Sequence, residues 1–326
     1  MAARPKALVT APFRGEGLET LHGLADVTVD PWIDHVPLRI LDGEKLAALI
    51  DETGAEILIV EADFVDGPVF DRPLRVIGTC RGDPTNVDVA AASKAGIPVL
   101  RAPGRNADAV AEMTLALLFA VNRSVLPADQ DVRTNQVFKD GKIPYQRYRA
   151  WQLAGRTAGI VGLGAVGRAT KWRLEGIGMR VLSFDPYNPE ATHKNLDEML
   201  PECDVVSMHA AVSPETERMM DAPQFALMPE GAIYVNSARA QLHSLTALTA
   251  ALQSGHLSGA GLDHFKGERL AEGHPIGAMT NVVLTPHIGG ATYDTEAIHS
   301  KLIADDVARI YAGEKPVNCV NPEVLD

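Results

Sequence analysis

The stretch AGIVGLGAVG, residues 158–167, joins a short apolar run to a turn rich in glycine. Five further apolar runs follow at helix-length intervals, and each ends on a polar residue. Short, β-rich runs that do not alternate with polar residues are typical of a parallel sheet covered by helices on both faces. Ligands bind beyond the carboxyl ends of such strands, so the residues that end the runs are expected to meet in one crevice. The five runs are 181–184, 205–208, 232–235, 260–262 and 282–284, and they are followed by Asp185, His209, Asn236 to Arg239, Asp263 and Thr285 to His287.

Three glycines, Gly162, Gly164 and Gly167, form the pattern GxGxxG. The pattern alone is weak evidence, because such spacing also arises by chance in ordinary loops. Here an apolar run precedes it and a helix-length stretch follows. In that context the glycines allow a tight turn, close approach of a pyrophosphate and close packing of helix on strand. Ala165 and Val166 would begin the helix whose N-terminus faces the phosphates.

Asp185 follows the second run, eighteen residues after Gly167. A carboxylate at this place accepts hydrogen bonds from the adenosine ribose hydroxyls and repels a 2′-phosphate. The next three residues, Pro186, Tyr187 and Asn188, include no arginine that could offset the repulsion. The sequence therefore predicts NAD rather than NADP as the cofactor.

Composition argues against several other classes of protein. The net charge of −12 and the pI of about 5.3 disfavour nucleic acid or an anionic membrane as a partner, because either would need a basic face. Cys80, Cys203 and Cys319 are few and far apart, and no CxxC or HExxH spacing suggests a disulfide framework or a metal site. The longest strongly apolar segment, 113–121, is much shorter than a membrane helix, and the first residues lack the apolar core of a signal peptide. We expect a cytoplasmic protein without a metal.

A length of 326 residues favours two domains. Residues 1–101 are expected to form strands and helices of a first domain, including a helix at 87–95 that opens at Thr85 or Asn86. Asn106 is a candidate N-cap for an apolar helix that is expected to be buried between the domains. Residues 126–154 are polar and are interpreted as a surface connection. Their cluster of Tyr145, Tyr148, Arg149 and Trp151 also suits a subunit interface.

His287, Glu268 and Arg239 all follow predicted strands in the second half of the chain. Taken singly, each is more readily explained as a structural histidine or a solvated charge. Together they supply a proton carrier, a carboxylate that can hold it and a fixed cation, which is the equipment of acid–base catalysis on an anionic substrate.

The glycine-rich turn, NSAR at 236–239, GLDHF at 261–265 with Glu268, and TPHIGGAT at 285–292 together resemble the D-isomer-specific 2-hydroxyacid dehydrogenases, most closely the phosphoglycerate dehydrogenase-like branch without a regulatory domain. The resemblance implies two Rossmann-like, doubly wound α/β domains, with the cofactor domain inserted into the substrate domain. Residues 1–101 and 290–326 would form the flavodoxin-like substrate domain and residues 102–289 the NAD domain. A homodimer is also implied.

The same resemblance assigns roles to individual residues. Arg239 would bind the substrate carboxylate, His287 would be the acid/base and Glu268 its partner, and a D-2-hydroxy acid, sugar-derived or phosphorylated in one version, would exchange a hydride with NAD. The cofactor-binding residues would be Gly162, Gly164, Ala165, Val166, Gly167, Asp185, His209, Ser237, Ala238, Arg239, Asp263, His287, Gly289 and Gly290, and the substrate-binding residues Thr79, Cys80, Arg81, Gly82, Arg239 and His287.

Two alternatives stay open at this point. Corepressors that sense NAD resemble the same family, and so does the phosphite dehydrogenase type of enzyme. The chain also departs from the family pattern at Ala240, His243, His264 and Arg269. These departures remove none of the three catalytic candidates, so they bear on the substrate and on loop shape rather than on the type of reaction.

Overall fold

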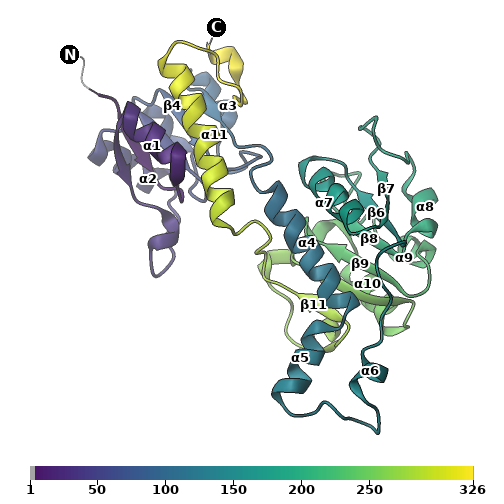
Figure 1. The fold of residues 1–326 in the computed structure, drawn as a ribbon. Coiled ribbons are helices and arrows are strands. Elements are labelled where there is room, and N and C mark those ends of the chain that lie inside the picture. Colours follow the sequence, from purple (N-terminus) through teal and green to yellow (C-terminus); the bar gives the residue numbers. More distant parts are fainter. Residues whose placement is uncertain (1–3, 326) are drawn as a thin grey trace. The chain divides into compact units, whose positions relative to one another are not determined.

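A computed structural model describes residues 4–325, and its chain divides into two compact units. The first unit combines the chain up to Arg105 with the chain from Thr292 onward, and the second unit is Asn106–Ala291. Each is an α/β unit built on a parallel sheet (Figure 1).

The first unit has five parallel strands in the order β2-β1-β3-β4-β5. The central strands are buried along their whole length, which explains why the sequence there is continuously apolar. The bounds are β1 Lys6–Val9, β2 Asp26–Val29, β3 Ile57–Val60, β4 Val76–Thr79 and β5 Val99–Leu100.

Helices cover both faces of this sheet, namely α1 (Gly15–Leu24) and α11 (Tyr293–Tyr311) on one and α2 (Gly43–Thr53) and α3 (Val89–Lys94) on the other. The pair α1 and α11 brings together the two ends of the chain. A Cβ on Gly17 would lie 2.2 Å from the carbonyl carbon of Ser300, so glycine is required for this close approach. Short 3-10 turns are η1 Trp32–Asp34, η2 Gly67–Asp71 and η7 Pro322–Leu325.

The second unit has six parallel strands in the order β11-β10-β9-β8-β6-β7. Helices α4 and α7 cover one face of the sheet, and α8, α9 and α10 cover the other. The strands are β6 Thr157–Val161, β7 Arg180–Phe184, β8 Val205–Met208, β9 Ala232–Asn236, β10 Leu257–Leu262 and β11 Val282–Leu284. The helices are α4 Ala107–Asn122, α5 Val125–Arg133, α6 Pro144–Arg147, α7 Ala165–Gly176, α8 Leu196–Met199, α9 Ala222–Leu227 and α10 Leu245–Gln253, with 3-10 turns η3 Leu200–Glu202, η4 Ala240–Leu242, η5 Lys266–Glu268 and η6 Pro275–Ala278.

Several local predictions need correction. Helix α3 is capped by the side chain of Asp88, not by Thr85 or Asn86, and Asn86 is buried where it hydrogen-bonds Thr79 and the Asp63 carbonyl. Asn106 does occupy the N-cap position of α4, but its side chain makes no capping hydrogen bond.

The segment after α4 also differs from expectation. One face of α4 packs on β9, β10 and β11 and on α7 of its own unit, while Phe119 on another face is 41% exposed. The segment expected to be a plain connection contains α5 and α6. Among residues 4–325 no single helix is long and apolar enough to cross a membrane, although α4 and α5, bent by 63° at their junction, pass that test as a pair.

Candidate functional site

The turn between β6 and α7 has the geometry that the glycine pattern predicts. Gly162 has φ +94°, and a Cβ there would lie 2.6 Å from the backbone nitrogen of Ala210. A Cβ on Gly167 would lie 2.0 Å from the Gly162 carbonyl oxygen, so neither position accepts a side chain. Gly164, by contrast, faces open space at the start of α7. The first-turn N–H groups, which have no partner within a helix, are therefore accessible to a phosphate at this turn.

Asp185 lies beside this turn at the end of β7. One carboxylate oxygen accepts from the backbone N–H of Leu163 at 2.9 Å, and the other accepts from those of Tyr187 and Asn188 at 3.0 and 3.2 Å. A carboxylate oxygen has two lone pairs, so the oxygen facing Leu163 keeps capacity for one ribose hydroxyl. The residues at this end fit an adenosine ribose.

Lys194 was missed by the sequence analysis. Its ammonium donates to the carbonyl oxygens of Asp185 and Asn188 at 3.0 and 2.6 Å and thereby fixes the loop after β7. Lys194 lies nine positions after Asp185, and a lone lysine in a polar loop carries no local signal of such a role.

Two further candidates lie where β8 and β9 end. His209 follows β8, and its Nε2 lies 2.8 Å from the Ser207 hydroxyl, while its buried Nδ1 has no protein partner. An unpartnered polar atom at this edge is available to a cofactor. Ser237 follows β9, and its hydroxyl is engaged with that of Thr114 on α4 at 2.6 Å.

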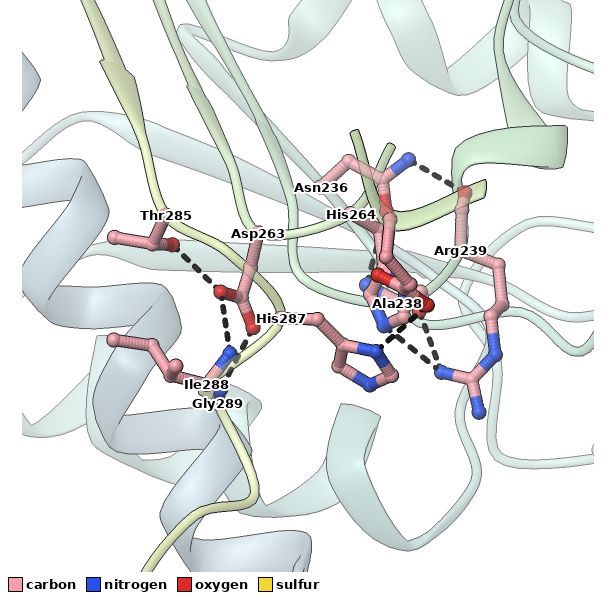
Figure 2. A network of polar contacts seen from close by, with 10 residues as sticks. Asn236, Ala238, Arg239, Asp263, His264, Thr285, His287, Ile288 and Gly289 are labelled. Atoms are coloured by element: carbon pink, nitrogen blue, oxygen red, sulfur yellow. Dashed lines mark hydrogen bonds and ion pairs between the residues drawn. The ribbon is translucent and has the colours of Figure 1, made fainter. Parts of the chain in front are cut away.

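Asp263 fixes the loop that follows β11 (Figure 2). Its carboxylate is buried and accepts from the Thr285 hydroxyl at 2.6 Å and from the backbone N–H groups of Ile288 and Gly289 at 2.9 and 2.7 Å. A Cβ on Gly289 would lie 2.8 Å from this carboxylate, and one on Gly290 would lie 3.1 Å from the Asn106 amide. The aspartate therefore positions the loop that carries His287.

His287 and Glu268 form a pair, with Nδ1 of the imidazole 3.0 Å from Oε1 of the carboxylate. Both residues have left-handed backbones, φ +56° and +57°, a conformation that costs on the order of 1–3 kcal/mol in a residue other than glycine. The side chains are 41% and 59% exposed, so an ion pair between them adds little to stability. The backbone strain at His287 and Glu268 is thus not offset by the stability that their ion pair adds, and this points to a functional role for the pair.

His264 joins this pair to Arg239. Its ring lies against that of His287, with centroids 3.5 Å apart, and its Nε2 accepts a hydrogen bond from Arg239 Nη1 at 3.2 Å. Because arginine can only donate, the proton of His264 resides on Nδ1. Burial, and secondarily the charges of His287 and Arg239, lower the pKa of His264 to about 4, so this ring is neutral near pH 7.

Burial similarly lowers the pKa of three other histidines, to about 3 for His209 and to about 4 for His243 and His299. In the unfolded chain these groups titrate near 6.5. Below that pH these histidines bind protons in the unfolded state but stay neutral in the folded state. The free energy of unfolding is therefore expected to fall from pH 6.5 to about 4, by up to about 1.4 kcal/mol per pH unit for each histidine. Urea unfolding midpoints measured across that range check this, and a flat profile would contradict it.

The predicted substrate loop lies in the first unit, at the end of β4. Thr79 and Cys80 are fully buried, and the Cys80 N–H donates to the Val60 carbonyl, so their side chains serve the core. Gly82 is half-buried. Arg81 donates from Nε to the Glu61 carbonyl at 2.6 Å and from Nη1 to the Thr85 hydroxyl at 3.1 Å.

A half-buried ion pair next to this loop was also missed. Arg105 Nη1 lies 2.5 Å from Glu61 Oε1 and 2.7 Å from His299 Nδ1, while His299 Nε2 donates to the Pro12 carbonyl. Glu61 follows the buried strand β3, so the strand-end rule applied to the second half of the chain would have found it here too.

Known proteins are similar to this chain over almost its whole length. A family model for the D-isomer specific 2-hydroxyacid dehydrogenase, NAD binding domain, matches residues 115–289. The glyoxylate reductase of Thermofilum pendens is 35% identical over 335 residues, covering 99% of this chain and 96% of that protein. The D-3-phosphoglycerate dehydrogenase of Methanocaldococcus jannaschii is 30% identical, covering 97% of this chain and 59% of that protein.

Among solved structures, the TT0316 protein of Thermus thermophilus matches with a TM-score of 0.82 at 34% identity, over 97% of this chain and 99% of that one. The family match falls within the second unit and spans the glycine turn, Asp185, Asp263 and His287. The second unit is therefore the NAD-binding domain.

Proposed function

Because the chain belongs to the D-isomer-specific 2-hydroxyacid dehydrogenase family and is an NAD-dependent oxidoreductase acting on CH–OH groups, we propose that it interconverts a small 2-keto acid and its D-2-hydroxy acid. The observation that carries the proposal is one polar network in which Glu268 contacts His287, the ring of His287 lies against that of His264, and His264 contacts Arg239. Figure 2 shows His287, His264 and Arg239 of this network. NAD supplies the hydride acceptor or donor when bound.

In this proposal Arg239 binds the substrate carboxylate. Its Nη1 is held by the Ala238 carbonyl at 2.7 Å and by His264, which orients the planar guanidinium. Arg239 is exposed, and its remaining N–H groups suit a charge-assisted pair with a carboxylate.

His287 handles the proton. Glu268 holds Nδ1, so Nε2 is the atom that donates a proton to the keto oxygen in reduction and accepts the hydroxyl proton in oxidation. The neutral ring of His264 lies against His287 without adding a competing positive charge at neutral pH.

We further propose that the substrate is small. Two donors of Arg81 are committed to Glu61 and Thr85, which weakens the case for a second cation reserved for a distal phosphate or sugar-acid group. The relative in Thermofilum pendens is a glyoxylate reductase. NADH oxidation with glyoxylate, pyruvate, hydroxypyruvate and 3-phosphohydroxypyruvate tests both points. Turnover of none of them would overturn the enzymatic proposal, and a strong preference for the phosphorylated acid would overturn the small-substrate one.

Glu268→Gln tests the partner of the acid/base. Without the carboxylate, the imidazolium of His287 is less stable, so in reduction the loss of rate toward high pH is expected to begin at lower pH than in the wild type. The measurement is kcat/KM against pH with saturating NADH. A superimposable profile would remove Glu268 from the mechanism.

We propose a homodimer in the cytoplasm, formed through the segment that contains α5 and α6. This segment exposes large apolar side chains that a monomer has no reason to display, among them Val132 (67%), Phe138 (75%), Tyr145 (77%) and Trp151 (75%). Light scattering is expected to give about twice the chain mass of 34.9 kDa. A mass near that of one chain at micromolar concentration would contradict the dimer.

A further inference from the structure

We propose that His264, Glu268 and His287 form a binding site for a divalent cation of the Zn²⁺ type, and that the bound cation switches the enzyme off. Within residues 4–325 these three are the one group of histidine, cysteine or acidic side chains whose ligand atoms converge, all lying within 4.8 Å of one another. Two imidazoles and a carboxylate suit Zn²⁺, which uses three protein ligands and leaves one position for water in open sites.

The three ligand atoms are close to the spacing that a zinc ion needs. Nδ1 of His287 lies 3.0 Å and Nδ1 of His264 lies 3.9 Å from the same oxygen of Glu268. Ligands at about 2.1 Å from a tetrahedral zinc ion are about 3.4 Å apart, so these two distances must each change by about half an ångström, while all the ligand atoms of the group lie within 4.8 Å of one another.

The backbone is already bent to present these atoms. His264 directly follows the buried Asp263 at the end of β10, and its own side chain is buried. Gly267 and Glu268 both have left-handed φ, +69° and +57°, which turns η5 so that the Glu268 carboxylate faces the two rings. Two ligands sit on an exposed surface, so an ion can enter from solvent.

Arg239 opposes the cation. A metal on Nδ1 of His264 requires the proton of that ring to move to Nε2, which would then confront the Arg239 N–H now 3.2 Å away. Zinc binding and the observed position of Arg239 are thus mutually exclusive, and occupancy releases the guanidinium from His264.

The expected consequence rests on the proposed function. The cation would replace the proton between His287 and Glu268, leaving the imidazole unable to be held as imidazolium, and would free the arginine proposed to bind the carboxylate. A cation bound by His264, Glu268 and His287 is therefore expected to inhibit keto-acid reduction, and a chelator should reverse the inhibition.

Isothermal titration of tag-free protein with ZnCl₂, without substrate or NADH, tests the site independently of catalysis. We expect one Zn²⁺ per chain, with binding weakened more than about ten-fold in both His264→Val and Glu268→Gln. His264 is buried, so His264→Val could lose zinc binding by misfolding. Glu268 is exposed, so Glu268→Gln is expected to fold normally and provides an independent test. Co²⁺ in place of Zn²⁺ should give the visible absorption of a four-coordinate site in the wild type, and this absorption should be lost in His264→Val and Glu268→Gln.

His35→Asn is the matched control, because His35 pairs with Asp30 at 2.8 Å yet has no third ligand. Its zinc affinity should equal that of the wild type, and Arg239→Ala should bind Zn²⁺ more tightly. Wild-type affinity in Glu268→Gln or His264→Val would overturn the site. If zinc binds as expected but keto acids are not reduced, the site stands and the proposed function fails.

Discussion

Replacing His287 with asparagine is expected to lower kcat for keto-acid reduction by roughly 10²- to 10⁴-fold, the usual scale for loss of a general acid. Asparagine is the appropriate substitute because position 287 has φ +56°, which asparagine tolerates better than other residues with a side chain. The Asp263 contacts to the loop involve backbone groups and the Thr285 hydroxyl, so the loop itself should be preserved.

The matched measurement is NADH binding by fluorescence. In this proposal the role of His287 is to transfer a proton, not to hold the cofactor. The NADH affinity of His287→Asn should therefore stay within a few-fold of the wild type. His22→Asn, an exposed histidine in the last turn of α1, serves as a control that should leave kcat unchanged. A His287→Asn enzyme with near-normal kcat would exclude this residue as the acid/base.

Preference for NADH over NADPH is expected to reach orders of magnitude in kcat/KM and to depend on Asp185. In NADPH a 2′-phosphate replaces the ribose hydroxyl from which Asp185 would accept a hydrogen bond. The negative charges of the phosphate and of the Asp185 carboxylate would then repel each other. Asp185→Ser should narrow the gap mainly by improving the use of NADPH, since Lys194 nearby already supplies a positive charge to the loop.

Asp185→Asn separates charge from geometry in this test. Its amide oxygen can retain part of the contacts to Leu163, Tyr187 and Asn188 while the charge is lost. If repulsion sets the preference, the asparagine and serine variants should both gain activity with NADPH. Equal kcat/KM of the wild-type enzyme with the two cofactors would refute the prediction.

Strands were predictable from the sequence because burial on both faces makes them continuously apolar. In the second unit, strands β8 and β11 have the bounds that their apolar runs give, and the other four strands differ by one to three residues at one end. The α/β class with two parallel sheets is confirmed. The order of strands within each sheet was not readable, because pairing depends on contacts between distant segments.

Site residues could be predicted from the sequence where they directly follow a strand. They were missed where their role depends on a contact with a residue distant in the sequence. The strand-end rule leads to Asp263 and His287, which the structure places on one loop network. The rule did not predict the contacts between these residues and their neighbours. His264, for example, was noted only as a departure from the family pattern, although it hydrogen-bonds Arg239. Arg105 and His299 meet across 194 residues, and no local periodicity reports such a contact.

The discontinuous first unit has a consequence for biosynthesis. Helix α11 contributes Ile303, Ala304 and Val307 to the core beneath β1, β3 and β4, yet it is translated after nearly all the rest of the chain. Domains generally fold as units while the chain emerges. Here the NAD-binding unit, continuous in sequence, is complete on the ribosome before α11 exists. Until α11 is synthesised, the face of the first sheet that it covers lacks the contacts of Ile303, Ala304 and Val307, so we expect the nascent chain to expose more apolar surface than the folded enzyme.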